Sequence, residues 1–223
     1  MTTTPTLRED LHAYLVGRGA VDQRLPECPD VEEKWNEICE AYLPDGVREW
    51  NAYPTVALGW PMFLGLALAQ LWDTDWEHWN ARPNLYAELR DVRGFDCMDE
   101  YILEDVLRLS PDEQARTSDL VGRMATRALS YLRRSSIEPG TPEAYRATVE
   151  AMHQLYLMGM AVRLKALGYH MEKMAYNSPF SLPIGPFTKK TNKYSSIMKH
   201  PLAAMMIASA SFCGFTSASA QKA

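Results

Sequence analysis

Sequence patterns that mark several common enzyme classes are absent from this chain. Its 223 residues contain no G-x-x-x-x-G-K-S/T, no G-x-G-x-x-G, no G-x-S-x-G and no H-E-x-x-H. These patterns hold nucleotide phosphates, dinucleotides, a catalytic serine or a zinc ion. Nucleotide-driven, dehydrogenase and hydrolase functions of those kinds therefore have no support from motifs.

Cysteine is scarce and irregularly spaced. The four cysteines, Cys28, Cys39, Cys97 and Cys213, form no C-x-x-C pair. Structural zinc sites and disulfide frameworks need regular spacings, so we expect free thiols in a reducing compartment. Residues 1–14 contain no apolar run and do not have the pattern of a secretory signal. Both observations favour a cytoplasmic protein.

The two halves of the chain carry opposite charge. Residues 1–120 contain 24 acidic and 10 basic residues, a net charge of −14, whereas residues 121–223 contain 4 acidic and 13 basic residues, a net charge of +9. Opposite charges attract, so we expect the two halves to pack together in one domain. The basic residues are scattered along expected helices, which argues against a nucleic-acid partner.

The feature that organises the chain is the segment 53–79, YPTVALGWPMFLGLALAQLWDTDWEHW. It is uncharged from Asn51 to Trp72 and then turns acidic, and all six tryptophans of the chain lie within 45 residues around it. An uncharged run of this length suits a membrane span or a buried helix. Prolines, glycines and a glutamine interrupt the run, so we predict a buried central helix within residues 54–80. Its start is placed near Pro61, because proline suits the first turn of a helix.

Signals for helix starts and ends recur along the rest of the chain. Ser110-Pro111-Asp112-Glu113 combines an N-cap serine, a first-turn proline and a glutamate that can complete a capping box. Thr141-Pro142-Glu143 starts another long helix that ends at Gly168, and the two helices are expected to form an antiparallel hairpin. Pro44-Asp45-Gly46 is expected to form a turn. Without strand-like alternation, the sequence predicts a single all-α, helical-bundle-like domain of about seven helices over residues 4–178.

Residues 179–223 differ in character from the rest of the chain. All 15 arginines precede residue 189, whereas residues 189–223 contain five lysines and no arginine. The stretch 198–220 has a basic start, an apolar middle and a small-residue end, like a secretory signal at the wrong end of a chain. One hypothesis is that residues 189–223 are a read-through product outside the evolved fold. The alternatives are a packed C-terminal helix and a membrane tail anchor.

The Trp-rich segment also contains the predicted binding site. Trp72, Trp76 and Trp79 share one face at helical spacing, and Asp75 lies beside them. An aromatic face near carboxylates suits a cation or the hot spot of a protein partner. The competing interpretation is core packing by large aromatic side chains. We predict a non-enzymatic binding module that uses this acidic-rimmed segment, with an unknown protein or a small cationic ligand as partner and no cofactor.

Two pairs of metal-ligating residues suggest an alternative function. Asp75 and His78 form D-x-x-H, and Glu150 and His153 form E-x-x-H, a spacing that helical bundles use to hold metal ions. A metal-dependent enzyme would need all four side chains to point inward. Helical geometry instead directs Glu150 toward solvent and His153 to the flank of the apolar face of residues 143–167. A second alternative is a protein attached to membranes through its C-terminal tail.

Overall fold

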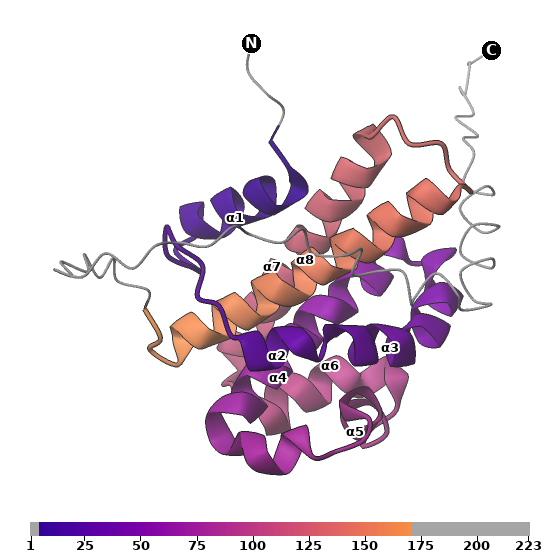
Figure 1. The fold of residues 1–223 in the computed structure, drawn as a ribbon. Coiled ribbons are helices and arrows are strands. Elements are labelled where there is room, and N and C mark those ends of the chain that lie inside the picture. Colours follow the sequence, from indigo (N-terminus) through magenta and orange to yellow (C-terminus); the bar gives the residue numbers. More distant parts are fainter. Residues whose placement is uncertain (1–4, 171–223) are drawn as a thin grey trace, which may run out of the picture.

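The computed structural model describes residues 5–170 of the chain, and within that range every regular element is helical (Figure 1). This confirms the all-α prediction. The predicted tail, residues 179–223 with its signal-like stretch 198–220, lies outside the described residues, as does the predicted boundary at residue 178. The elements are α1 (Leu7–Gly17), α2 (Pro29–Glu33), α3 (Trp35–Trp50), α4 (Pro54–Asn80), α5 (Leu85–Arg90), the 3₁₀ turn η1 (Phe95–Cys97), α6 (Met98–Tyr101), the π turn η2 (Ile102–Val106), α7 (Pro111–Arg134) and α8 (Pro142–Ala166).

Helices α4 and α8 form the centre of the fold. Every residue from Ala57 to Ala69 in α4 is buried, which confirms the predicted central helix. Every residue from Ala151 to Ala161 in α8 is buried as well. The sequence predicted one apolar face for this helix, with His153 at its flank and Glu150 toward solvent. The protein therefore has two buried helices where one was predicted.

Two glycines allow the backbones of α4 and α8 to touch. A Cβ atom on Gly65 would lie 2.0 Å from the carbonyl oxygen of Tyr156, and one on Gly159 would lie 2.1 Å from the carbonyl oxygen of Met62. Real Cβ atoms do not approach an oxygen this closely, so any other residue would push the helices apart. The distance between α4 and α8 is therefore set by two residues without side chains.

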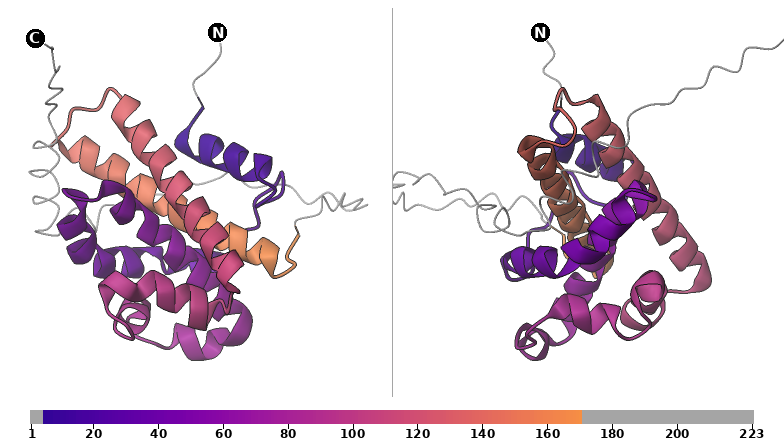
Figure 2. Two further views of the ribbon diagram at one scale, coloured as in Figure 1. Left: turned by 180° about the vertical axis from the view of Figure 1, so that it is seen from behind. Right: turned by 90° about the vertical axis from the view of Figure 1, so that its right-hand side faces the viewer.

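Helix α7 lies on one side of this central pair. Figure 1 shows it behind α8, and the reverse view in Figure 2 shows it in front. Its predicted start is confirmed, because the backbone N–H and the hydroxyl of Ser110 both donate to Glu113 Oε2, at 2.9 and 2.6 Å. Helices α7 and α8 contact each other, but α8 packs chiefly against α4. The predicted contact between α7 and α8 is thus smaller than the contact between α4 and α8, because the glycines bring α8 closest to α4.

Ion pairs join the acidic first half of the chain to the basic second half. Arg127 of α7 donates through Nη2 to Asp10 of α1 at 2.7 Å. Lys165 of α8 lies 2.8 Å from Asp22, and His170 lies 3.0 Å from the same carboxylate. Hydrogen bonds from Lys165 and His170 lower the pKa of Asp22. These contacts agree with the expectation that the two halves pack together.

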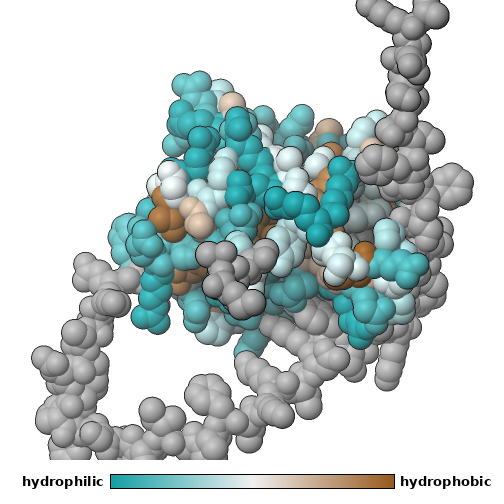
Figure 3. Space-filling model, turned by 90° about the horizontal axis from the view of Figure 1, so that it is seen from above, coloured by the Kyte–Doolittle hydropathy of each residue, from teal (hydrophilic) through white to brown (hydrophobic). Residues whose placement is uncertain are grey.

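Helix α4 is long and apolar enough to cross a membrane, judged by length and composition alone. However, 78% of its most apolar window is buried inside the fold, as in the core helix of a soluble protein. Figure 3 shows one face of the molecule, where the coloured surface is mainly hydrophilic with small, separate apolar areas. The large hydrophobic side chains exposed within residues 5–170 are Tyr53, Val56, Val92, Ile137 and Tyr169.

The prediction that the central helix begins near Pro61 is wrong. Helix α4 begins at Pro54, which occupies its first turn. Pro61 lies inside the helix and has no N–H to donate to the carbonyl oxygen of Ala57. The buried hydroxyl of Tyr42 donates to that oxygen instead, at 2.6 Å. A side chain of α3 thus satisfies the backbone group that Pro61 leaves without a partner, and the helix continues.

The turn predicted at Pro44-Asp45-Gly46 is also absent, because all three residues lie within α3. Buried residues lie on both sides of Pro44 in this helix. Their packing outweighs the low helix propensity of proline and glycine. Gly46 has a local role, since a Cβ atom there would lie 2.8 Å from the ring of Tyr42.

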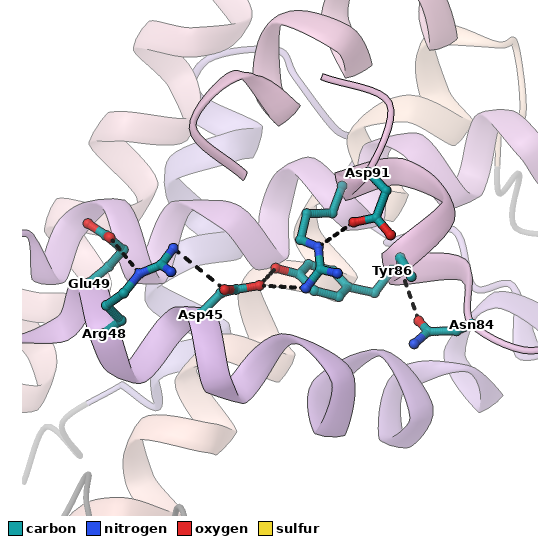
Figure 4. A network of polar contacts seen from close by, with 8 residues as sticks. Asp45, Arg48, Glu49, Asn84, Tyr86 and Asp91 are labelled. Carbon is teal, nitrogen blue, oxygen red and sulfur yellow. Dashed lines mark hydrogen bonds and ion pairs between the residues drawn. The ribbon is translucent and has the colours of Figure 1, made fainter. Parts of the chain in front are cut away.

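A polar network fastens the short helix α5 to α3 (Figure 4). The hydroxyl of the buried Tyr86 donates to Asp45 Oδ2 at 2.6 Å, and Arg90 Nη1 donates to the same oxygen at 3.1 Å. Arg90 Nε also donates to Asp91 at 2.7 Å. Burial and the bond to Asp45 raise the pKa of Tyr86, and the bonds to Asp91 and Asp45 raise the pKa of Arg90. The ring of Tyr86 meets that of Tyr42 edge-on, so the network extends toward α4.

Candidate functional site

The three tryptophans of the predicted binding site lie at the edge of the core. Trp72, Trp76 and Trp79 are each partly buried and pack against core residues. The ring nitrogen of Trp72 donates to Asp30 Oδ2 at 3.1 Å, and its ring meets that of Tyr169 edge-on with centroids 5.6 Å apart. Much of the indole surface that was expected to contact a ligand therefore contacts the protein itself.

Asp75 interrupts the helix between these tryptophans. Its backbone leaves the helical region, with φ −163° and ψ 76°, and its Oδ1 accepts a hydrogen bond from the backbone N–H of His78 at 3.2 Å. Asp75 thus caps the turn that follows a kink in α4. The kink means that Trp72 does not share one straight helical face with Trp76 and Trp79. The D-x-x-H pattern acts here as a helix cap.

The other predicted metal-ligating pair lies in the middle of α8. His153 is buried, not at the flank as predicted, and its ring stacks on that of Trp35 with centroids 4.9 Å apart. Glu150 is partly buried and accepts a hydrogen bond from Gln154 Nε2 at 2.7 Å. No group of three or more His, Cys, Asp and Glu side chains within residues 5–170 is placed to hold a metal ion.

The structure therefore does not bring Asp75, His78, Glu150 and His153 together as one metal centre. The physical reason is that each pair has a local role. Asp75 caps a turn of α4 through the His78 amide, and His153 packs on an indole in the core.

An open groove of about 720 Å³ lies between the first half of α4 and the middle of α7. Val56, Trp60 and Phe63 line it from α4, at the i, i+4 and i+7 spacing of one helix face. Val121 and Gly122 line it from α7. The rings of Trp60 and Phe63 pack together with centroids 5.8 Å apart, so the aromatic part of the lining is held in place.

Most charged side chains around the groove are paired with one another. Arg123 Nε donates to Asp119 at 2.7 Å, and Arg127 is held by Asp10. The Arg123 bond lowers the pKa of Asp119, and the bonds to Asp119 and Asp10 raise the pKa of Arg123 and Arg127 respectively. Asp99 of α6 also lines the groove, and its carboxylate has no ion pair or hydrogen bond within residues 5–170. The groove thus combines an apolar lining with one carboxylate, Asp99, that makes no ion pair within the described residues.

Gly122 lines the groove from α7 and contributes no side chain to it. It lies in the interior of α7, and a Cβ atom built there would meet no atom within 4 Å. Glycine inside a helix costs about 1 kcal/mol relative to alanine. Neither a positive φ nor a close contact requires glycine at this position. Gly122 is exposed, so a side chain at this position would have free space around it.

The predicted site lies in the second half of segment 53–79, whereas the groove is lined by the first half. The spacing of Val56, Trp60 and Phe63 was visible in the sequence. In a run that is apolar on every side, however, this face did not differ from the others. The partner wall comes from α7, and only the tertiary fold brings it there.

Comparisons of the chain with protein-family models, with curated proteins and with solved structures find no match.

Proposed function

We propose that this protein is a non-enzymatic binding protein. It binds a small organic cation with an apolar body in the groove between α4 and α7. The class of function is the one predicted from the sequence. The site predicted from the sequence was the second half of segment 53–79, with Trp72, Asp75, Trp76 and Trp79. The site proposed from the structure is instead the groove lining around Trp60. The observation that carries the proposal is the groove itself, whose lining combines the apolar face of α4 with the carboxylate of Asp99, which makes no ion pair within the described residues.

The size and chemistry of the groove support this ligand class. Its volume of about 720 Å³ falls within the range of roughly 300–1,000 Å³ that is typical of small-molecule sites. Trp60 and Phe63 are buried and contribute apolar surface to the lining. Asp99 offers a carboxylate that has no counter-ion within the described residues. A charge-assisted hydrogen bond to Asp99 would therefore orient an ammonium group.

Calorimetric titration of the full chain with 2-phenylethylammonium tests the proposal, with 2-phenylethanol as the uncharged match. We expect saturable binding of the cation and weaker binding of the alcohol. Asp99→Asn should remove most of this difference, because the variant keeps the shape and loses the charge.

A second pair of variants tests the location. Gly122→Leu fills the groove and improves helix propensity, so binding should be lost without loss of thermal stability. Ala115→Leu adds a leucine side chain at an exposed position of the same helix that does not line the groove, and should bind as the wild type does. Wild-type affinity in Gly122→Leu would refute the proposed site.

A further inference from the structure

A second hollow, of about 500 Å³, lies where α7 faces the ends of α1, η2 and α8. It is separate from the groove, apart from Asp119, which borders both. Apolar side chains of three helices cover its walls, among them Leu66 of α4, Leu120 of α7 and Val162 of α8. Three arginines, Arg18, Arg116 and Arg163, also line it. This combination of apolar walls and several cations is not used by the function proposed above.

Arg163 is the most enclosed of these cations. Its guanidinium donates to Gln70 Oε1, through Nε at 2.8 Å and also through Nη2, and it lies 3.4 Å from the carbonyl oxygen of Leu107. Both partners are neutral, and Arg163 makes no ion pair within residues 5–170. Burial lowers the pKa of Arg163, although an arginine stays protonated near neutral pH. The hydrogen-bond partners of Arg163 are thus neutral, while the carboxylates of Asp73 and Glu113 attract its charge from nearby.

The acidic side chains at the hollow are already engaged. Glu113 Oε2 accepts two bonds from Ser110, which lower the pKa of Glu113 first, and Arg116 and Arg163 lower it further. Asp119 accepts a bond from Arg123, and Arg18 lies only loosely beside it at 3.8 Å.

Arg116 is exposed and has no ion pair or hydrogen bond within the described residues. Arg116 and Arg163 line the hollow together with Arg18, and the acidic residues of the lining are Glu113 and Asp119. Positive charge therefore exceeds negative charge there.

The backbone at the η2 edge of the hollow adopts two uncommon conformations. Residues Ile102–Val106 form a π turn, with the N–H of Leu107 bonded to the carbonyl oxygen of Ile102 at 2.8 Å. Arg108 follows with φ 54°, a left-handed conformation that side chains disfavour. This path directs the carbonyl of Leu107 to Arg163 and places Leu107 and Leu109 in the lining. Such turns and strained residues occur frequently at binding sites.

We infer that this hollow binds a small organic anion with an apolar body, of the class of medium-chain carboxylates. The carboxylate contacts Arg116 and Arg163, and the chain lies against Leu66, Leu120 and Val162. The volume of about 500 Å³ is sufficient for a ligand of this size.

Titration of the full chain with octanoate tests the inference, with 1-octanol as the uncharged match. We expect saturable binding of octanoate, weaker binding of the alcohol, and a loss of octanoate affinity as sodium chloride is raised. Arg116→Ala should weaken octanoate binding by about tenfold, the effect of one charge-assisted hydrogen bond. Because Arg116 is exposed and makes no hydrogen bond or ion pair within the described residues, the variant should fold normally. Arg134→Ala removes an exposed arginine elsewhere on α7 and should bind within about twofold of the wild type.

Two outcomes would overturn the inference. One is equal octanoate affinity in Arg116→Ala and the wild type. The other is binding of 1-octanol as tight as that of octanoate. Gly122→Leu, which fills the groove, should leave octanoate binding unchanged, so the failure of one site can be told from the failure of the other.

Discussion

Replacement of Gly65 by alanine tests the central packing of the fold directly. The added Cβ atom would lie 2.0 Å from the carbonyl oxygen of Tyr156 and 2.9 Å from the backbone nitrogen of Met160. An ordinary contact of this kind is at least 3.4 Å, so α4 and α8 must separate by about 1.4 Å at their crossing. A backbone on each side leaves no flexible side chain that could move aside.

The expected cost follows from this separation. A gap of about 0.5–1 Å already removes a quarter to a half of the dispersion energy of each contact that it opens. Overpacking of a core typically costs about 1–3 kcal/mol, and movement of a backbone places Gly65→Ala at the upper end. Alanine's better helix propensity returns about 1 kcal/mol. We therefore expect a net loss of at least about 2 kcal/mol, or a fall in Tm of about 4–8 °C for a domain of this size.

Urea and thermal unfolding followed by circular dichroism measure this loss. Gly159→Ala should behave in the same way, and the double variant should lose less than the sum, because the first substitution already separates the helices. Gly122→Ala is the matched control: it adds the same methyl group to a helix where nothing lies within 4 Å, and should raise stability by up to about 1 kcal/mol. A Gly65→Ala protein as stable as the wild type would refute the proposed contact between the two backbones.

Four further predictions follow from single contacts. Tyr86→Phe removes the hydroxyl that donates to Asp45 and should lower the unfolding free energy, measured by urea titration, by about 1.5–3 kcal/mol. An unchanged unfolding free energy would show that this hydrogen bond does not stabilise the fold. Burial raises the pKa of Tyr42 well above its ordinary value of 10.0, so its contribution to stability is complete below pH 10 and falls as the pH rises further; urea midpoints that stay constant to pH 11 would contradict this. Arg108→Gly relieves a left-handed φ of 54° and should raise Tm by the equivalent of about 1 kcal/mol, whereas a lower Tm would argue against strain at this residue. Burial raises the pKa of Cys39 to about 12, so iodoacetamide at pH 8 should label this thiol much more slowly in the native protein than in urea, as mass spectrometry would show.

Features that depend on neighbouring residues were readable from the sequence. The capping residues before α7 and α8 lie within three positions of the N–H groups that they satisfy, as the Thr141 hydroxyl and the amide of Ala144 illustrate at 3.2 Å. The burial of residues 57–69 followed from a run without charge. Both signals are local, and tertiary contacts left them unchanged.

Features that depend on distant residues were not readable. Pro61 is a helix-starting signal in isolation, and it lies inside α4 only because Tyr42 of another helix satisfies the carbonyl of Ala57. Asp75 and His78 have the spacing of metal ligands, but a kink converts that spacing into a cap. The groove around Trp60 could not be predicted, because its second wall belongs to α7.

The sequence by itself determined the helical class, the starts of α7 and α8 and the uncharged run at the centre, because these depend on hydrogen bonds and periodicity within a few residues. Only the tertiary structure decided that residues 151–161 of α8 are buried on all sides, that two glycines far apart in the chain set the crossing of α4 and α8, and where hollows remain on the surface. The physical reason is that packing depends on the side chains of both contacting helices, and the sequence of one helix does not specify the surface of the other.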